Sequence, residues 1–153
     1  MWLRAFQFLS LLLVALTLAP AMAHLLELPN KMALSHDEYF IVQQIYRGWA
    51  LLGFVVFGAL FSTLILAVIV RHNRKIFLLT VAALICIAGS LIVFFSFTYP
   101  ANQLTNNWTR LPENWLELRR QWEYSHATGA VLYLIALVML LLSVLSTDKR
   151  AAR

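Results

Sequence analysis

A chain of 153 residues that is 61% hydrophobic and 12% charged cannot bury its apolar side chains in a water-soluble core of its size, because small domains leave much of their surface in water. The composition therefore excludes an ordinary soluble domain and indicates a lipid bilayer as the surrounding partner. The net charge of +5 agrees with nucleic-acid binding by sign alone, so the positions of the basic residues decide what it means.

Four apolar stretches follow one another along the chain. A helix needs about 20 apolar residues to cross roughly 30 Å of hydrocarbon, and suitable stretches occupy residues 2–23, 46–70, 76–97 and 127–145. With their flanks they predict helices over about 2–26, 35–70, 76–99 and 112–146. The predicted fold is all-α: a single membrane domain, 1–153, that forms a four-helix transmembrane bundle with helices two and four extended on the outer side.

The first stretch has two interpretations. Arg4, the apolar run and Ala21-Met22-Ala23 are also typical of a secretory signal peptide with a small-residue cleavage site. The run is longer than the roughly 7–15 apolar residues usual in such a signal, which favours a retained helix. Cleavage would leave a bundle of three helices.

The second predicted helix is unusually long. Pro29 and Asn30 are expected to break the chain after the first helix, and Ser35-His36-Asp37-Glu38 reads as a capping box that begins the next one. No further breaker precedes the turn at 71–75, so this helix is predicted to run for about 35 residues, or about 52 Å. It should protrude from the membrane.

The third helix is expected to end at Tyr99-Pro100, before a polar loop over 101–111. Pro112 suits the first turn of a helix, where an N–H group would have no helical partner. The helical pattern then continues without a break into the last apolar stretch. The fourth helix is therefore predicted to extend beyond the membrane on the same side as the second.

The charged residues divide unequally between the two ends of such a bundle. Seven basic residues and one acidic residue flank the end that holds both termini and the 71–75 turn, whereas five basic and six acidic residues flank the other end. By the positive-inside rule, both termini are cytoplasmic and the protein lies in the inner (cytoplasmic) membrane. The basic charge is thus a topology signal, no nucleic-acid partner is expected, and no protein partner is indicated.

The only cysteine, Cys86, lies in the middle of the third apolar stretch. A single cysteine excludes an intrachain disulfide, a dithiol redox mechanism and a zinc site built on cysteine pairs.

Polar and aromatic residues share one face of the fourth helix. At about 100° per residue this face contains Arg119, Trp122, Glu123, His126, Ala130 and Tyr133. Glu123 and His126 form a Glu-x-x-His pair, the spacing with which bundle helices present a carboxylate and an imidazole to one metal ion. The reversed pair His24-x-x-Glu27 ends the first helix at the same level. Ionisable groups at membrane depth normally face the bundle interior or water, which favours a functional site.

The same residues also allow a structural interpretation. An ion-pair network that places His24 or Lys31 against Glu123, and Arg119 against Glu27, would only hold the helices together. We expect His24, Glu27, Glu123 and His126 instead to converge around a pocket.

The second helix adds two polar residues to this pocket. Gln43 and Tyr46 lie on one helical face with Ala50 and Gly53, whose small side chains suit close helix packing and point that face inward. Most other aromatic residues on this side are expected to form an interfacial belt.

Four strings carry a resemblance to a known family: AHLLELPNK (23–31), YFIVQQIYRGW (39–49), TYPANQ (98–103) and NWLELRRQWEYSHA (114–127). Together they resemble the anthrone-oxygenase-like integral membrane family, most of whose bacterial members have no known function. The family pattern falls on Trp115, Leu118, Arg119, Trp122 and His126. The resemblance covers nearly the whole chain and implies a four-helix membrane bundle with a retained first helix. It also implies cofactor-free oxidation of anthrones to anthraquinones by molecular oxygen.

The leading interpretation is a small multi-pass membrane oxidoreductase or oxygenase that acts on a lipophilic aromatic or quinone-like substrate. In a cofactor-free scheme, His126, oriented by Glu123, removes a proton, while Arg119 and Asn102 stabilise the resulting oxyanion. The predicted catalytic residues are His126, Glu123, Arg119, His24 and Glu27. The predicted substrate-binding residues are Trp122, Asn102, Tyr46, Gln43 and Trp115.

Two alternatives remain open at the level of sequence. A metal ion or haem bound through His24 and His126, with Glu27 and Glu123 nearby, would make the protein a membrane redox carrier. A non-enzymatic membrane subunit or scaffold would use the same residues as an internal clasp.

Overall fold

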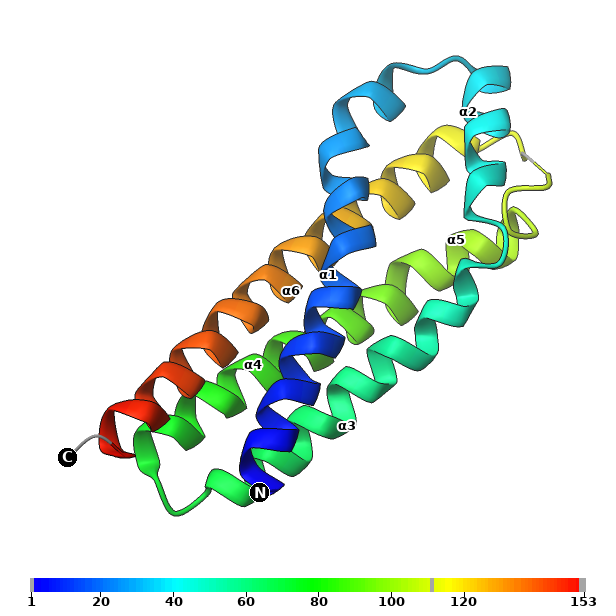
Figure 1. The fold of residues 1–153 in the computed structure, drawn as a ribbon. Coiled ribbons are helices and arrows are strands. Elements are labelled where there is room, and N and C mark those ends of the chain that lie inside the picture. Colours follow the sequence, from blue (N-terminus) through cyan, green and yellow to red (C-terminus); the bar gives the residue numbers. More distant parts are fainter. Residues whose placement is uncertain (1, 111, 152–153) are drawn as a thin grey trace.

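The four long apolar helices predicted from the sequence form the body of the molecule (Figure 1). The computed structural model describes residues 2–110 and 112–151, and in these residues it contains helices and no strand. The long helices are α1 (Trp2–Ala33), α3 (Leu52–Val70), α4 (Arg74–Val93) and α6 (Trp115–Ala151). The all-α four-helix bundle is therefore confirmed.

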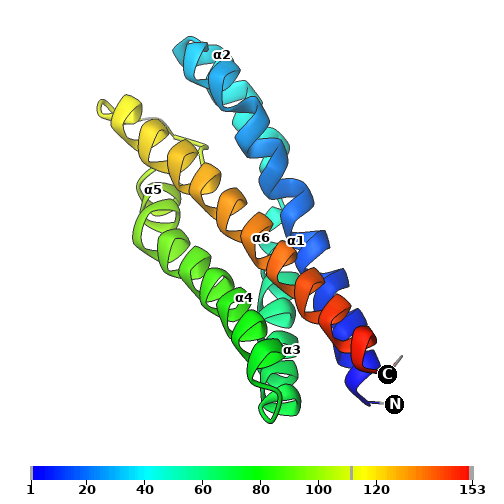
Figure 2. The same ribbon diagram turned by 90° about the vertical axis from the view of Figure 1, so that its left-hand side faces the viewer.

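The helices form a ring in which each long helix packs against two others. α1 contacts α3 and α6, and α4 contacts the same two helices. Figure 2 shows α1 and α6 running side by side, with both termini at one end of the bundle. The α3–α4 turn lies at that end as well, whereas α2 (His36–Gln43) and α5 (Tyr99–Leu104) lie at the other, which we call the α2 end (Figure 1).

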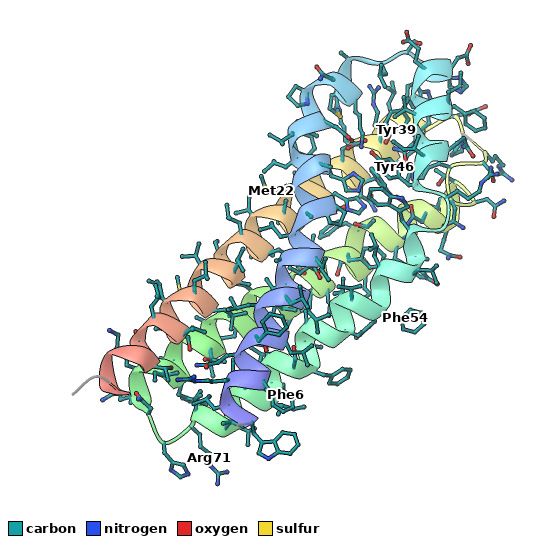
Figure 3. The ribbon with its side chains drawn as sticks, in the orientation of Figure 1. Phe6, Met22, Tyr39, Tyr46, Phe54 and Arg71 are labelled. Carbon is teal, nitrogen blue, oxygen red and sulfur yellow. The ribbon has the colours of Figure 1, made fainter. Side chains whose placement is uncertain are left out.

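The bundle interior is apolar through most of its length, and so is its outer surface. Val14, Leu66, Ile87 and Leu140, one from each long helix, are almost completely buried against one another. Phe54 is 80% exposed and points away from the bundle (Figure 3). Large apolar side chains on both faces of a helix are what a lipid surrounding requires, because lipid tails and core side chains are equally apolar.

The first helix is longer than predicted. The expected break at Pro29 and Asn30 is wrong, because α1 continues through both residues to Ala33. Pro29 lies on the exposed side of the helix, where loss of one backbone hydrogen bond disturbs no packed contact. The guanidinium of Arg119 also donates hydrogen bonds to the carbonyls of Lys31 and Leu34, which satisfies acceptors at the end of α1.

The second helix is interrupted, which contradicts the uninterrupted span over 35–70. The chain forms α2, a 3₁₀ turn over Gln44–Tyr46, a second 3₁₀ turn over Trp49–Leu51, and then α3. Gly48 separates the two 3₁₀ turns with a φ of +88°, a left-handed conformation that only glycine adopts readily. The predicted start is correct, because the Glu38 carboxylate accepts hydrogen bonds from the Ser35 backbone N–H and hydroxyl.

The third and fourth helices also differ from their predicted limits. α4 continues into a π-helical turn over Phe94–Thr98 and then into α5, so the chain does not leave the helix at Tyr99-Pro100. Pro112 precedes the last helix rather than beginning it, since α6 starts at Trp115. From there α6 runs past Arg119 without a break, as predicted.

Candidate functional site

The predicted polar residues of α1 and α6 meet at the α2 end of the bundle. The imidazole rings of His24 and His126 stack with centroids 4.2 Å apart and an interplanar angle of 24°. The rings of Tyr46 and Trp122 lie 4.7 and 5.1 Å from that of His24. Figure 3 places Tyr46 and Tyr39 in this region, between α1, α2 and α6. The expected shared layer of His24 and His126 is therefore present.

Lys31 lies at the centre of the cluster, although its side chain is only 4% exposed. Its Nζ atom is 3.0 Å from Oε2 of Glu27, 3.6 Å from Oε2 of Glu123 and 3.2 Å from Nδ1 of His24. It also lies over the ring of Tyr46, 4.5 Å from the centroid. A buried ammonium group is stable only with such partners. Lys31 therefore joins α1 to α6 through the Glu123 carboxylate, while Glu27 holds the ammonium group from within α1.

The contact with Lys31 fixes the protonation of His24. An ammonium group has hydrogen atoms to donate and no lone pair to accept with, so Nδ1 of His24 must accept. An imidazole that accepts at Nδ1 and is neutral has its proton on Nε2. The His24 ring therefore presents an N–H donor on the side away from Lys31.

Glu123 is completely buried and is held by donors from α2. Its Oε1 atom accepts hydrogen bonds from the Tyr39 hydroxyl at 3.0 Å and from Nε2 of Gln43 at 3.5 Å. The predicted orientation of His126 by Glu123 is therefore wrong, since the carboxylate points to α2 and Lys31. The one-turn spacing places Glu123 and His126 on one helical face, but hydrogen bonds to residues of α2, which are distant in sequence, decide where the Glu123 carboxylate points.

The two tyrosines of this region act as hydrogen-bond donors. The Tyr46 hydroxyl donates to Oε2 of Glu27 at 2.8 Å, as Tyr39 does to Glu123. Burial, together with the neighbouring carboxylate in each case, raises the pKa of Tyr39 and of Tyr46 far above the usual range of a phenol. Both hydroxyls therefore keep their protons at all physiological pH values.

Arg119 serves the backbone of α1 rather than the cluster. Its Nη1 atom lies 2.8 Å from the carbonyl oxygen of Leu34, and its guanidinium stacks on the rings of Trp115 and Tyr39 at 4.8 and 5.4 Å. Of the ion pairs that the clasp interpretation assumed, Arg119 with Glu27 is absent among the described residues, whereas Lys31 with Glu123 is present. The guanidinium is also committed to these contacts and does not support the predicted oxyanion role.

Asn102 is likewise committed to its neighbours. Its Oδ1 atom accepts hydrogen bonds from the indole N–H groups of Trp122 at 2.8 Å and Trp108 at 3.2 Å. Asn102 therefore orients Trp122 against the histidines and does not fit the predicted role at the oxyanion. Trp115 contacts His36 and Tyr39, so it packs above the cluster rather than against His126.

Two aromatic residues that the sequence assigned to a membrane belt belong to the site. Trp49 lies 5.8 Å from the ring of His24 and 4.9 Å from that of Tyr46, and Tyr39 binds Glu123 directly. Belt and site residues share the same depth and composition, so composition does not separate them. The spacing of Tyr39, Gln43 and Tyr46 along one helical face was the available signal.

The arrangement does not suit the metal or haem alternative. Within residues 2–110 and 112–151, no group of three or more His, Cys, Asp or Glu side chains is placed to hold a metal ion. The Lys31 ammonium lies where a cation between Glu27 and Glu123 would bind. Two axial ligands of a haem must point their nitrogens at the iron from opposite sides, whereas His24 and His126 stack face to face.

Two acceptors of the cluster have no hydrogen-bond donor within the described part of the chain. They are Oε1 of Gln43 and Oε2 of Glu123, on two buried side chains that contact each other. The nearest cation, Nζ of Lys31, is 3.6 Å from Glu123, which is too long for a good hydrogen bond. Buried acceptors of this kind call for a donor from water or a ligand.

Comparison with known proteins gives no match to a family model, a curated protein or a solved structure.

Proposed function

We propose that this protein is a small membrane oxygenase that oxidises a lipophilic aromatic substrate with molecular oxygen, without a resident cofactor. The observation that carries the proposal is the stacking of His126 on His24, whose Nδ1 atom lies 3.2 Å from Nζ of Lys31. His126 is partly exposed and makes no hydrogen bond among the residues that the structure describes. An imidazole that makes no hydrogen bond supplies a base, and the N–H donor of the stacked His24 ring stabilises negative charge.

The chemistry balances without a metal or flavin. The imidazole of His126 takes a proton from an activated CH₂ group of the substrate. The electron pair of that C–H bond is delocalised onto the oxygen of the conjugated carbonyl group, which forms an enolate. The enolate gives one electron to O₂, and the two radicals combine to form a C–O bond. The protonated imidazole returns its proton to the peroxide. Loss of water then breaks the O–O bond and leaves a new carbonyl group. One CH₂ group and one O₂ become one C=O group and one water.

The surrounding residues provide the remaining functions. The Nε2–H group of His24 donates to the enolate oxygen, because the contact of Lys31 with Nδ1 fixes the His24 proton on Nε2. The rings of Tyr46 and Trp49, which are not buried, offer flat surfaces on which an aromatic substrate stacks, and the buried ring of Trp122 packs against Tyr46. The likeness of 114–127 to the anthrone-oxygenase-like family supports the same reaction class. With the termini in the cytoplasm of an inner-membrane protein, the cluster lies toward the outer leaflet.

The test is oxygen uptake by the purified protein in lipid nanodiscs with anthrone as substrate. We expect consumption of one O₂ for each anthraquinone formed, at a rate above that of nanodiscs without protein. Anthracene, which has the same three rings without an acidic CH₂ group, should not be oxidised. Anthrone oxidation no faster than in empty nanodiscs would contradict the proposal.

A second candidate function has its own support. Lys31 binds carboxylates from two helices, and Arg119 joins the backbone of α1 to α6, so the cluster also fits a clasp in a non-enzymatic membrane subunit. In that case no anthrone is oxidised, and replacement of cluster residues changes only the stability of the bundle.

A further inference from the structure

A row of aromatic rings leads outward from the histidine pair. The ring of Trp122 lies 4.2 Å from that of His126 and 5.4 Å from that of Tyr46, measured between centroids. The ring of Tyr46 lies in turn 4.9 Å from that of Trp49. These separations are those of aromatic rings in direct contact. Trp122, Tyr46 and Trp49 therefore form a continuous series, which we call the aromatic row.

The aromatic row runs from the interior of the bundle to its surface. Trp122 is 3% exposed and Trp49 is 37% exposed, and Tyr46 between them is half-buried. Trp49 also begins one of the four segments that are long and apolar enough to cross a membrane. A tryptophan at such a position lies where the hydrocarbon meets the headgroups. One end of the aromatic row is thus accessible from the bilayer, while the other contacts His126.

Tyr46, in the middle of the aromatic row, has a base for its phenolic proton. Its hydroxyl donates a hydrogen bond of 2.8 Å to Oε2 of Glu27, whose side chain is 43% exposed. An oxidised phenol is a strong acid, so the Glu27 carboxylate receives the proton when Tyr46 loses an electron. Because Glu27 is half-exposed, this proton then has access to water.

The charge above the Tyr46 ring couples the loss of the electron to the loss of the proton. Nζ of Lys31 lies 4.5 Å from the centroid of that ring. A positive charge at this distance opposes a second positive charge on the ring. Oxidation is therefore favourable only when the proton leaves together with the electron, and its product is a neutral tyrosyl radical beside a protonated Glu27.

Tyr39 provides a comparison within the same site. Its hydroxyl also donates to a carboxylate, that of Glu123, at 3.0 Å. Glu123 is completely buried, however, so a proton placed on it has no direct access to water. The ring of Tyr39 contacts the buried ring of Trp108 rather than that of Trp49. Tyr46 thus combines an accessible base with an exposed aromatic neighbour, and Tyr39 has neither of these in its contacts with Glu123 and Trp108.

We infer that Tyr46 is a redox-active tyrosine that reduces a lipid peroxyl radical at the α2 end of the bundle. The O–H bond of Tyr46 breaks. Its electron passes through the indole of Trp49 to the peroxyl radical, and its proton forms an O–H bond on Glu27. The peroxyl radical becomes a peroxide anion, which takes a proton from water to give a lipid hydroperoxide. Glu27 returns its proton to the hydroxide that remains. This activity goes beyond the proposed oxygenase, because it uses neither O₂ nor His126.

The test produces the radical with an external one-electron oxidant. Tris(bipyridine)ruthenium is photo-oxidised by a light flash beside the protein in lipid nanodiscs, with a cobalt(III) ammine as the electron acceptor. Electron paramagnetic resonance detects the radical, and ring-deuterated tyrosine identifies it, because deuterium narrows the tyrosyl signal. Tyr99→Phe/Tyr124→Phe is the background, since both tyrosines are exposed and react with the oxidant directly. We expect a tyrosyl radical in this background.

Further variants assign the signal to one residue. Tyr46→Phe keeps the ring and removes the hydroxyl, so the tyrosyl signal should be lost. Tyr39→Phe, the matched control, should retain it. Glu27→Gln keeps an acceptor for the Tyr46 hydroxyl but removes the base, so the radical should form more slowly by about 10²-fold or more. Trp49→Leu, at the exposed end of the aromatic row, covers the case in which these variants do not fold, and it should lower the signal.

A tyrosyl signal that persists in Tyr46→Phe, or that Tyr39→Phe removes to the same extent, would overturn the inference. An unchanged signal in folded Trp49→Leu would do the same. Because the experiment uses no anthrone, absence of anthrone oxidation refutes the oxygenase and leaves the assignment of Tyr46 intact. Absence of the tyrosyl radical refutes the assignment of Tyr46 and leaves the oxygenase intact.

Discussion

At the scale of single residues, Lys31 is the cation around which the side chains of α1 and α6 gather at the α2 end. The sequence placed His24, Glu27, Glu123 and His126 at one level, and the structure brings these residues together. Lys31 was considered only as part of a clasp, because Pro29 was expected to end the helix before it. Since α1 continues, Lys31 lies four residues after Glu27 and seven after His24, on one helical face.

The first prediction concerns this lysine. Lys31→Met keeps the length of the side chain but leaves the buried Glu123 carboxylate without a cation. Removal of one partner from a buried ion pair destabilises a protein by about 3–5 kcal/mol. The midpoint temperature of thermal unfolding in detergent should therefore be much lower for Lys31→Met than for the wild type. The double variant Lys31→Met/Glu123→Gln should regain part of this loss, because it has no buried unpaired charge. Lys75→Met, at an exposed lysine, serves as the control. Equal effects at Lys31 and Lys75 would refute the buried cluster.

The second prediction concerns the tyrosine hydroxyls. Because burial beside a carboxylate raises the pKa of Tyr39 and of Tyr46 in the folded protein, the unfolded tyrosines ionise first as the pH rises. Their contribution to stability is full below about pH 10 and is lost above it. The double variant Tyr39→Phe/Tyr46→Phe should therefore lose stability less steeply above that pH than the wild type. Tyr124→Phe, at an exposed tyrosine, should follow the wild-type profile; an unchanged slope in the double variant would contradict the assignment.

At the scale of elements, hydropathy predicted the long helices well and their ends poorly. The apolar stretches require helices in a membrane, because every backbone group needs a partner there. The ends depend on contacts that no local pattern contains. Arg119 satisfies the end of α1 from a distant part of the chain, and Gly48 interrupts the second predicted helix with its left-handed φ. A glycine inside a helical pattern is compatible with both outcomes, so the break was not predictable.

The third prediction tests that break. Gly48→Ala places a Cβ atom in the left-handed region, which is unfavourable by about 1–2 kcal/mol, although no neighbour lies within 4 Å. The variant should unfold at a lower temperature than the wild type. Gly89→Ala, where the helix is regular and the new methyl group meets an ordinary contact, should not. A midpoint for Gly48→Ala at or above that of the wild type would show that the chain continues as one helix.

At the scale of the whole molecule, composition determined the class of protein, and the division of charge predicted its orientation. Neither determined which helices are neighbours. The contacts of α1 with both α3 and α6 bring His24 between Trp49 and His126. The contacts that occupy Arg119, Asn102 and Trp115 follow from the same packing, and they do not support the roles predicted for these residues.

The fourth prediction is the orientation of the bundle. Both termini and the α3–α4 turn lie at one end (Figure 1), and this end has the basic excess that marks a cytoplasmic side. A single cysteine placed at His72, in a Cys86→Ser background, should be protected from a membrane-impermeant thiol reagent in intact cells. A cysteine at Asn107 should be labelled. The reverse pattern would refute this topology.

The central claim is that the cluster at the α2 end performs chemistry rather than only holding helices together. The most direct test is the rate of anthrone oxidation by His126→Ala, corrected for the fraction of folded protein. His126→Ala removes the ring contacts with His24 and Trp122 but no hydrogen bond within the described residues, so the variant should fold with a lowered unfolding temperature. Loss of a general base should lower the oxidation rate by about 10²–10⁴-fold. A corrected rate equal to that of the wild type would contradict the account.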